Sequence, residues 1–264
     1  GSIQPGLQPV MVSVKNFGAD TLGNAQINWS VNGTLQTPFP WNGALSFNEV
    51  KDSVVVGLFN FLSGTQYQIK AWTSMPNGFV DVNVYNDSAT TGTLRAMLCG
   101  TYTIGGANSD FVSFTDAIGF LNSAGITCPV VFKVRDGVYT EQLEIGAISG
   151  SSAVNTITFE SESGDSSAVV LKFDVASGVS STILLNGTKH INFRRMTFQR
   201  SSGAHVFNLI NGASYIDISN CQLSSSAWNG VYILIEGISS RKILINNNYF
   251  IWGGYLLYRE WPDL

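Results

Sequence analysis

Three aromatic side chains near the C-terminus have the chemistry to bind a carbohydrate. Trp228 and Trp252 each follow the third short apolar segment of a repeated unit, and Tyr255 lies just beyond Trp252. If the units stack in register, both indoles lie near each other along one edge. Flat aromatic faces stack on sugar rings because they offer a large rigid area at low entropic cost. The pattern predicts a carbohydrate-binding strip. The alternative is that these rings pack on a neighbouring loop or cover the final unit.

The repeats contain few residues that could act as a general acid or base. Asp217 is the only acid in the outward column of its predicted strand, and Glu236 is the nearest second carboxylate. Glycoside hydrolysis needs two carboxylates that face each other across a cleft, and Glu236 at a glycine turn is more simply interpreted as solvated. His190 and His205 have no Ser or Cys nucleophile at a suitable spacing, so both are interpreted as turn histidines. We expect no catalytic group, and His205 and Asp217 are only further candidates for contacting a sugar.

The chain contains three cysteines, Cys99, Cys128 and Cys221. Cys99 and Cys128 flank one compact segment and would form a disulfide if the protein is exported, which the sequence leaves open. Cys221 lies within an apolar repeat and is predicted to be a small buried hydrophobe. Without a CxxC pair or a histidine at metal-ligand spacing, neither a metal nor a cofactor is expected.

The composition excludes several classes of protein. Only 12% of the 264 residues are charged, against about 25% in typical domains. The formal net charge of -4 and the absence of a basic stripe argue against nucleic-acid binding, which needs clustered Lys and Arg. No apolar run reaches the length of about 18 residues that could span a bilayer. A polar but uncharged surface is typical of secreted β-rich proteins, so we expect an extracellular location, secreted or on the cell surface.

One predicted helix precedes the repeats. "SFTDAIGFLNSAG" begins with Ser113 as N-cap, has Asp116 three residues later as a capping box, and stops at Gly125. The apolar residues on one face are Phe114, Ala117, Ile118 and Leu121. A single amphipathic helix ahead of a run of strands is expected to cover the open end of stacked apolar layers.

The stretch after this helix repeats itself. "ILLNGTKHINFRRMTFQ", "FNLINGASYIDISNCQLS" and "ILIEGISSRKILINNNYFI" share an apolar strand, a glycine turn, a second apolar strand and a short third one. Their glycines, Gly187, Gly212 and Gly237, are 25 residues apart. This period, with three short strands per unit, predicts a right-handed parallel β-helix over residues 98–264.

The same alignment assigns positions within each coil. Asn220 and Asn247 fall where such solenoids form amide ladders, and Arg195 interrupts the ladder one coil earlier. "YLLY" (255–258) aligns with "YILI" (232–235), so the chain is expected to stop one strand into a further coil. Either it is a piece of a longer protein, or the residues around Trp261 fold over as a cap. The predicted inward residues are Ile191, Phe193, Ile216, Ile218, Ile243 and Ile245.

The first third of the chain follows a different pattern. Short alternating strands such as "VMVSVK" and "YQIKAW" are separated by turn residues between about Pro9 and Arg95. Asn32-Gly33 is a strong signal for a two-residue hairpin. Several strands at regular spacing, without helical periodicity, predict a β-sandwich over residues 9–97. Residues 1–8 are interpreted as a tag remnant and an N-terminal extension.

The segments "VSVKNFGADTLGNAQINWSVNG", "IKAW" and "DVNVYNDS" resemble CARDB, the immunoglobulin-like, cell-adhesion-related domain of bacteria. The resemblance covers about a third of the chain. It implies an immunoglobulin-like sandwich, a bacterial source and a role in adhesion.

The segments "GGANSDFVSFTDAIGFLNSAG", "VVFKVRDGVYTEQLEI" and "NTITFES" resemble the pectin-lyase-like superfamily, and pectin methylesterases in particular, over roughly residues 100–250. The resemblance implies action on, or binding of, acidic polysaccharides along an outward strand face. His205 stands where the esterases have a Gln, and Ser226, Ala227 and Trp228 surround the position that requires an Asp. Without that carboxylate there is neither nucleophile nor proton donor, so the esterase mechanism is not supported.

Together, these patterns predict a non-catalytic, secreted or cell-surface module for adhesion or polysaccharide binding. The expected partners are a polysaccharide and further domains of the same longer chain, without nucleic acid or membrane insertion. Two alternatives stay open: a fragment of a carbohydrate-active enzyme of the lyase or esterase type, with its active site missing or unrecognised, and a structural stalk of a large surface protein. A carboxylate cluster on one face would favour the enzyme, an aromatic strip the binder, and neither the stalk.

Overall fold

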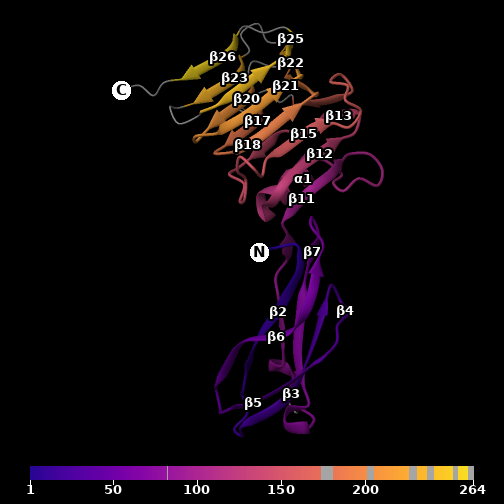
Figure 1. Ribbon diagram of the computed structural model, residues 1–264, viewed down its shortest axis with the longest axis vertical. Coiled ribbons are helices and arrows are strands. Elements are labelled where there is room, and N and C mark those ends of the chain that lie inside the picture. Colours follow the sequence, from indigo (N-terminus) through magenta and orange to yellow (C-terminus); the bar gives the residue numbers. More distant parts are fainter. Residues whose placement is uncertain are drawn as a thin grey trace. The chain divides into compact units, whose positions relative to one another are not determined.

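A computed structural model of the chain describes residues 1–81, 83–173, 181–200, 205–225, 231–236, 241–251 and 255–260. The chain divides into two compact units, Gly1–Met97 and Leu98–Leu264. Both are built mainly from strands (Figure 1). Among the described residues, no helix has the length and apolarity needed to cross a membrane.

The first unit is a β-sandwich. One sheet consists of β2 (Gly6–Lys15) and β6 (Val50–Phe61), which run antiparallel to each other. The second sheet is centred on β3 and comprises β3 (Leu22–Val31), β4 (Thr34–Leu35), β5 (Phe39–Leu45), β8 (Ile69–Ser74) and β9 (Ser88–Thr90). A single core of buried side chains lies between the two sheets and includes Val10, Ile27, Trp29, Trp41 and Phe61. Alternation of apolar and polar residues along β2 accounts for its buried and exposed faces.

Short elements complete this unit. β1 (Ser2–Ile3), β10 (Leu94–Ala96) and β7 (Gln66–Tyr67) form a small third sheet, and two 3₁₀ helices span Pro76–Gly78 and Val84–Asn86. Residues 2–3 and 6–8, which were predicted to belong to a tag remnant and an N-terminal extension, therefore lie in strands of this unit. Backbone pairing holds them, as in the bond from Met97 N–H to the Ile3 carbonyl at 2.9 Å.

The hairpin predicted at Asn32-Gly33 is confirmed. Val31 pairs with Thr34 across the turn. The φ angles of Asn32 and Gly33 are 47° and 79°, so both are left-handed, as a type I′ turn requires.

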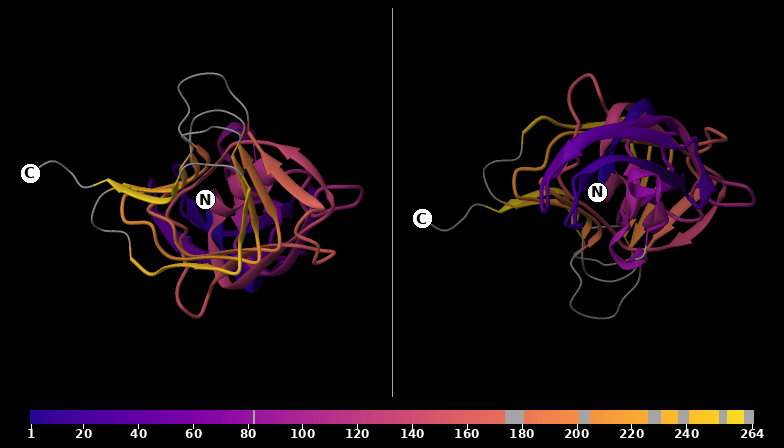
Figure 2. Two further views of the ribbon diagram at one scale, coloured as in Figure 1. Left: turned by 90° about the horizontal axis from the view of Figure 1, so that it is seen from above. Right: turned by 90° about the horizontal axis from the view of Figure 1, so that it is seen from below.

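The second unit is a parallel β-helix with three sheets, and its coils superimpose when seen from above (Figure 2, left). The first sheet contains β11 (Leu98–Ile104), β12 (Ile126–Val134), β15 (Ile157–Ser161), β18 (Lys189–Arg194), β21 (Ser214–Ser219) and β24 (Ile243–Asn246). The second contains β13 (Gly137–Thr140), β16 (Val169–Lys172), β19 (Thr197–Arg200), β22 (Gln222–Ser225) and β25 (Tyr249–Ile251). The third contains β14 (Leu143–Ile145), β17 (Ser181–Asn186), β20 (His205–Ile210), β23 (Val231–Glu236) and β26 (Tyr255–Glu260).

Stacked side chains fill the interior of this solenoid. The rings of Phe132 and Phe159 stack with centroids 4.6 Å apart, and those of Phe159 and Phe193 stack at 5.7 Å. The predicted inward positions Ile191, Phe193, Ile216 and Ile218 are at most 1% exposed, and Ile243 and Ile245 pack on the same core. Each fully buried side chain of this kind stabilises the fold by roughly 1.5–3 kcal/mol, so the interior fixes the register of the outward faces.

A helix covers the first coil, as the sequence predicts. α1 (Phe114–Ala124) contacts β11 and β14 and buries its apolar face in the solenoid core. Ser113 Oγ accepts the N–H of Asp116 at 3.1 Å, and Gly125, with φ 77°, ends the helix. The Asp116 carboxylate accepts the N–H of Val112 at 3.2 Å, one residue earlier than in the predicted capping box.

Two of the three cysteines are bonded to each other, which was one of the two possibilities that the sequence left open. Cys99 in β11 and Cys128 in β12 form a disulfide, which closes a loop that contains α1. Cys221 is buried, and burial raises the pKa of its thiol to about 11.

One predicted alignment is wrong by a residue. β26 pairs with β23 in the third sheet, but Leu257 lies opposite Ile233, and Tyr255 lies opposite Val231 instead of Tyr232. Both strands are nearly continuous apolar runs, VYILIE and YLLYRE, and without alternation such runs do not distinguish neighbouring registers.

Candidate functional site

The solenoid has two rows of turns whose side chains differ. The first, here called the cationic edge, lies where the third sheet turns into the first, and consists of Lys189, His190, Ser214, Tyr215, Arg241 and Lys242. The second, here called the amide edge, lies where the first sheet turns into the second, and consists of Arg195, Asn220 and Asn247. Both rows follow from the repeat, because each coil contributes one turn to each row.

Backbone pairing sets the cationic edge in two adjacent columns. Lys189 lies opposite Ser214. The N–H of Arg241 donates to Ser214 Oγ at 3.1 Å, and the N–H of Tyr215 donates to the Arg241 carbonyl at 2.9 Å. Since neighbouring strands are about 4.8 Å apart, the backbones of Lys189 and Arg241 are separated by about 10 Å across two coil spacings.

A stack of side chains forms the second column. The rings of His190 and Tyr215 lie 4.4 Å apart at an interplanar angle of 17°. Lys242 Nζ lies 5.2 Å from the centroid of the Tyr215 ring, within the range of a cation–π interaction. The stack therefore holds one ammonium group and one imidazole at fixed positions along the edge.

The backbone of this stack is strained. His190, Tyr215 and Lys242 have φ angles of 58°, 60° and 53°. The left-handed conformation costs a residue with a Cβ roughly 1–2 kcal/mol, and Asn and Asp tolerate it best. Strained positions of this kind cluster at functional sites, so the choice of Tyr and Lys here points to a role for their side chains.

The cations of this edge have no acidic partners. In the described part of the chain, no carboxylate lies within 4.0 Å of the side-chain nitrogens of Lys189, Arg241 or Lys242. Burial and the neighbouring Lys189 charge lower the pKa of His190, so its imidazole is neutral at neutral pH. Among the described residues, the edge thus carries three positive charges without an acidic partner, in a protein whose formal net charge is -4.

The outward face of the first sheet shows the opposite arrangement. Lys133 Nζ lies 2.6 Å from Glu160, and Arg195 pairs with the same carboxylate. Two further ion pairs of the described residues are Arg135 with Glu162 at 3.4 Å and Arg194 with Asp217 at 3.5 Å. Each base described in these pairs thus has a carboxylate partner, whereas the cations of the cationic edge have none among the described residues.

The sequence-predicted site residues are not brought together. Asp217 lies on β21 between Asn192 and Leu244, as predicted, and its carboxylate pairs with Arg194. His205 begins β20 in a different sheet, opposite Ser181. Trp228 and Trp252 lie outside the described residues, as do the side chains of Tyr255 and Glu236. The aromatic strip therefore stays a prediction, and so does the interpretation of Glu236 as a solvated turn residue.

Sequence reasoning missed the cationic edge, although a signal for it exists. When "KHINF", "SYIDI" and "RKILI" are aligned, the two residues before each inward isoleucine are Lys-His, Ser-Tyr and Arg-Lys. Neither polarity nor hydrophobic periodicity distinguishes these pairs from ordinary turn residues. Whether Lys189, Arg241 and Lys242 have acidic partners among the described residues depends on contacts across coils.

No protein-family model matches the chain, and no curated protein matches it. Among solved structures, the chain is similar to the CARDB domain of the PF1109 protein from Pyrococcus furiosus, solved in complex with di-metal ions. That match has 25% identity and a TM-score of 0.30 and covers 37% of this chain and 84% of that one. Two structures of the pectin methylesterase from Aspergillus niger match at 13% identity, with TM-scores of 0.37 and 0.36. Each match covers 59% of this chain and 60% of the esterase, so the chain spans less than two thirds of the esterase's length.

These matches concern the same two families that the sequence resembles, and the chain's own strand pairing shows the architecture. A β-sandwich precedes a parallel β-helix that one helix covers.

Proposed function

We propose that this chain is a non-catalytic module of a secreted or surface-attached protein, and that its cationic edge binds an acidic polysaccharide. The observation that carries the proposal is the set of cations Lys189, Arg241 and Lys242, which have no acidic partner among the described residues. They lie on the first and third of three consecutive turns that the backbone pairing holds in register. A linear polymer matches such a row better than a compact ligand does, because both repeat along one axis.

Hydrogen-bonding groups accompany the charges on the same turns. Asn211 Nδ2 donates to Asn186 Oδ1 at 2.7 Å, and Asn186 Nδ2 donates to Glu144 Oε1 at 3.3 Å. Amides of this kind suit sugar hydroxyls, which both donate and accept. Glu144 places a negative charge at one end of the Asn186–Asn211 pair. An acidic polymer would therefore run from Lys189 towards Arg241, away from Glu144.

Two further observations support a non-catalytic, extracellular module. The acids described on the first-sheet face, Glu160, Glu162 and Asp217, are each ion-paired with a neighbouring base. Paired in this way, they do not form the two opposed carboxylates that hydrolysis uses. The Cys99–Cys128 disulfide fits an oxidising compartment.

Affinity electrophoresis through gels containing polygalacturonate tests the proposal, with neutral dextran gels as reference. The double variant Lys189→Gln/Arg241→Gln should bind polygalacturonate at least about tenfold more weakly, which corresponds to about 1.4 kcal/mol. The matched control is Lys51→Gln/Lys172→Gln, which removes two charges outside the cationic edge. Added salt should weaken the wild-type interaction, since exposed charges are screened.

Three outcomes would count against this function. The first is an absence of retardation by polygalacturonate, and the second is an equal loss of retardation in both double variants. In the third, Trp228→Ala/Trp252→Ala abolishes retardation while Lys189→Gln/Arg241→Gln keeps it. That result would move the site to the aromatic strip predicted from the sequence.

A further inference from the structure

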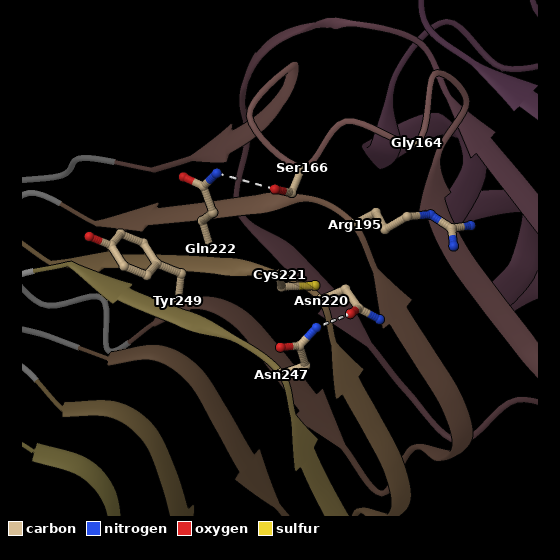
Figure 3. A pocket seen from close by; sticks show the side chains of 8 residues that line it. All are labelled: Gly164, Ser166, Arg195, Asn220, Cys221, Gln222, Asn247 and Tyr249. Carbon is tan, nitrogen blue, oxygen red and sulfur yellow. Dashed lines mark hydrogen bonds between the residues drawn. The ribbon is translucent and has the colours of Figure 1, made fainter.

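An open groove of about 460 Å³ runs along the amide edge (Figure 3). Arg195, Asn220, Gln222, Asn247 and Tyr249 line it from three successive coils, and Ser166 from the loop between β15 and β16 forms part of its wall. This groove shares no residue with the cationic edge.

Contacts among the amide side chains hold them in place. Asn247 Nδ2 donates to Asn220 Oδ1 at 2.6 Å, which confirms the predicted ladder. Gln222 Nε2 donates to Ser166 Oγ at 3.1 Å. Within the described residues, the remaining polar atoms of these amides have no partner: Asn220 Nδ2 is a free donor, and Asn247 Oδ1 and Gln222 Oε1 are free acceptors.

The mixture of donors and acceptors selects the charge of a ligand. Sugar hydroxyls donate and accept, so they satisfy both kinds of atom. A carboxylate only accepts and would meet the free acceptor oxygens unfavourably. Arg195 is the one cation that lines the described groove, and its guanidinium is paired with Glu160, which also binds Lys133. It is therefore the free acceptor oxygens of Asn247 and Gln222 that favour a hydroxyl-bearing ligand over an anion.

An exposed ring provides the apolar wall. Tyr249 is 66% exposed and lies opposite Gln222 across β22 and β25. Its N–H donates to the Cys221 carbonyl at 2.8 Å, which fixes its backbone. A flat aromatic face beside fixed amides matches a sugar ring, whose apolar C–H face is bordered by hydroxyls.

We propose that this groove binds a neutral saccharide, with a sugar ring on Tyr249 and its hydroxyls on Gln222, Asn220 and Asn247. The site goes beyond the proposed function because it lies on the other edge and takes an uncharged ligand.

Isothermal titration calorimetry on the full chain tests this site, with cellohexaose, xylohexaose, mannohexaose and maltohexaose as probes. At least one probe should bind, and Tyr249→Ala and Gln222→Ala should each raise its Kd by about tenfold or more. Tyr249→Phe keeps the ring and should change the Kd by less than about threefold. Tyr85→Ala is the matched control, since Tyr85 is 97% exposed in the other unit.

Several results would overturn the inference: no probe binds, a probe binds equally well to Tyr249→Ala and Gln222→Ala, or hexagalacturonate displaces the bound probe. Thermal unfolding of each variant identifies a loss of binding that comes from misfolding. The Lys189→Gln/Arg241→Gln variant separates the two proposals, because it should keep neutral binding in full while losing retardation by polygalacturonate.

Discussion

The two turn edges of the solenoid share a backbone conformation but not a set of side chains. On the amide edge, Arg195, Asn220 and Asn247 have φ angles of 51°, 55° and 50°. On the cationic edge, the corresponding angles of His190, Tyr215 and Lys242 are 58°, 60° and 53°. Asparagine tolerates this left-handed conformation, whereas tyrosine and lysine do so poorly. Backbone geometry thus explains the asparagines, and the chemistry of the exposed side chains better explains the cationic edge.

The edges also differ in how their polar groups are satisfied. Beside the amide ladder, Asn248 Nδ2 donates to the Ile218 carbonyl at 2.7 Å, and the N–H of Cys221 donates to Asn248 Oδ1 at 2.8 Å. This side chain joins two coils. On the cationic edge, the cations described have no acidic partners. One edge mainly stabilises the stack, and the other mainly exposes charge.

The largest expected effect is on the stability of the whole solenoid, and therefore concerns both edges equally. The Cys99–Cys128 bond joins residues 29 positions apart. Closing a loop of this length lowers the entropy of the unfolded chain, which raises its free energy by about 3–4 kcal/mol. Cys99→Ala/Cys128→Ala should lower the free energy of unfolding in urea by that amount while leaving both binding activities intact in the folded protein. If either binding activity were lost while the fold was retained, the edge that carries it would depend on the disulfide-linked first coils.

The next largest effect concerns the amide edge alone. Asn248→Ala leaves the Cys221 N–H and the Ile218 carbonyl without their partner, and an unsatisfied buried group costs about 1–3 kcal/mol. We expect a loss of about 2–3 kcal/mol in urea unfolding. The matched control is Asn246→Ala, which changes the exposed last residue of β24 and should cost less than about 0.5 kcal/mol. Equal costs for the two variants would show that Asn248 does not join the coils.

Comparison of the two edges also shows what the sequence alone can predict. The α1 cap, the Asn32-Gly33 hairpin and the inward isoleucines follow from local spacing, and the structure confirms them. Asn220 and Asn247 were also predictable, because the conformation itself favours asparagine. The pairing of Lys133 with Glu160 joins residues one coil apart, and the unpaired state of Lys189 depends on all its spatial neighbours. Such charge relations require the register across coils, in which the alignment of β26 was one residue out.

A reciprocal exchange tests the difference in backbone strain. Asn220→Tyr should cost about 1–2 kcal/mol, because it introduces a bulky residue at a left-handed position and removes the bond from Asn247. Tyr215→Asn relieves the same strain but loses the stack with His190, so its free energy of unfolding should stay within about 0.5 kcal/mol of wild type. Equal costs in both directions would show that the two edges impose the same structural demand.

The smallest expected effect is the pH dependence that His190 adds. Its native pKa is lowered from 6.5, chiefly by burial and then by Lys189, so the unfolded chain binds a proton more readily than the native one. The related stability is fully present above about pH 6.5 and declines as the pH falls through this value towards the lower native pKa. His190→Asn should reduce the slope of the urea midpoint between about pH 8 and about pH 5, and an unchanged slope would contradict this.

The same imidazole reports which edge a ligand occupies. A bound anion favours the charged form of a nearby group, so polygalacturonate should raise the pKa of His190 towards or above its ordinary value. The chain has only two histidines, and His205→Gln leaves one histidine signal to follow by NMR. A neutral hexasaccharide at the amide edge should leave that titration unchanged. If the acidic polymer also left it unchanged while still binding, the cationic edge would not be its site.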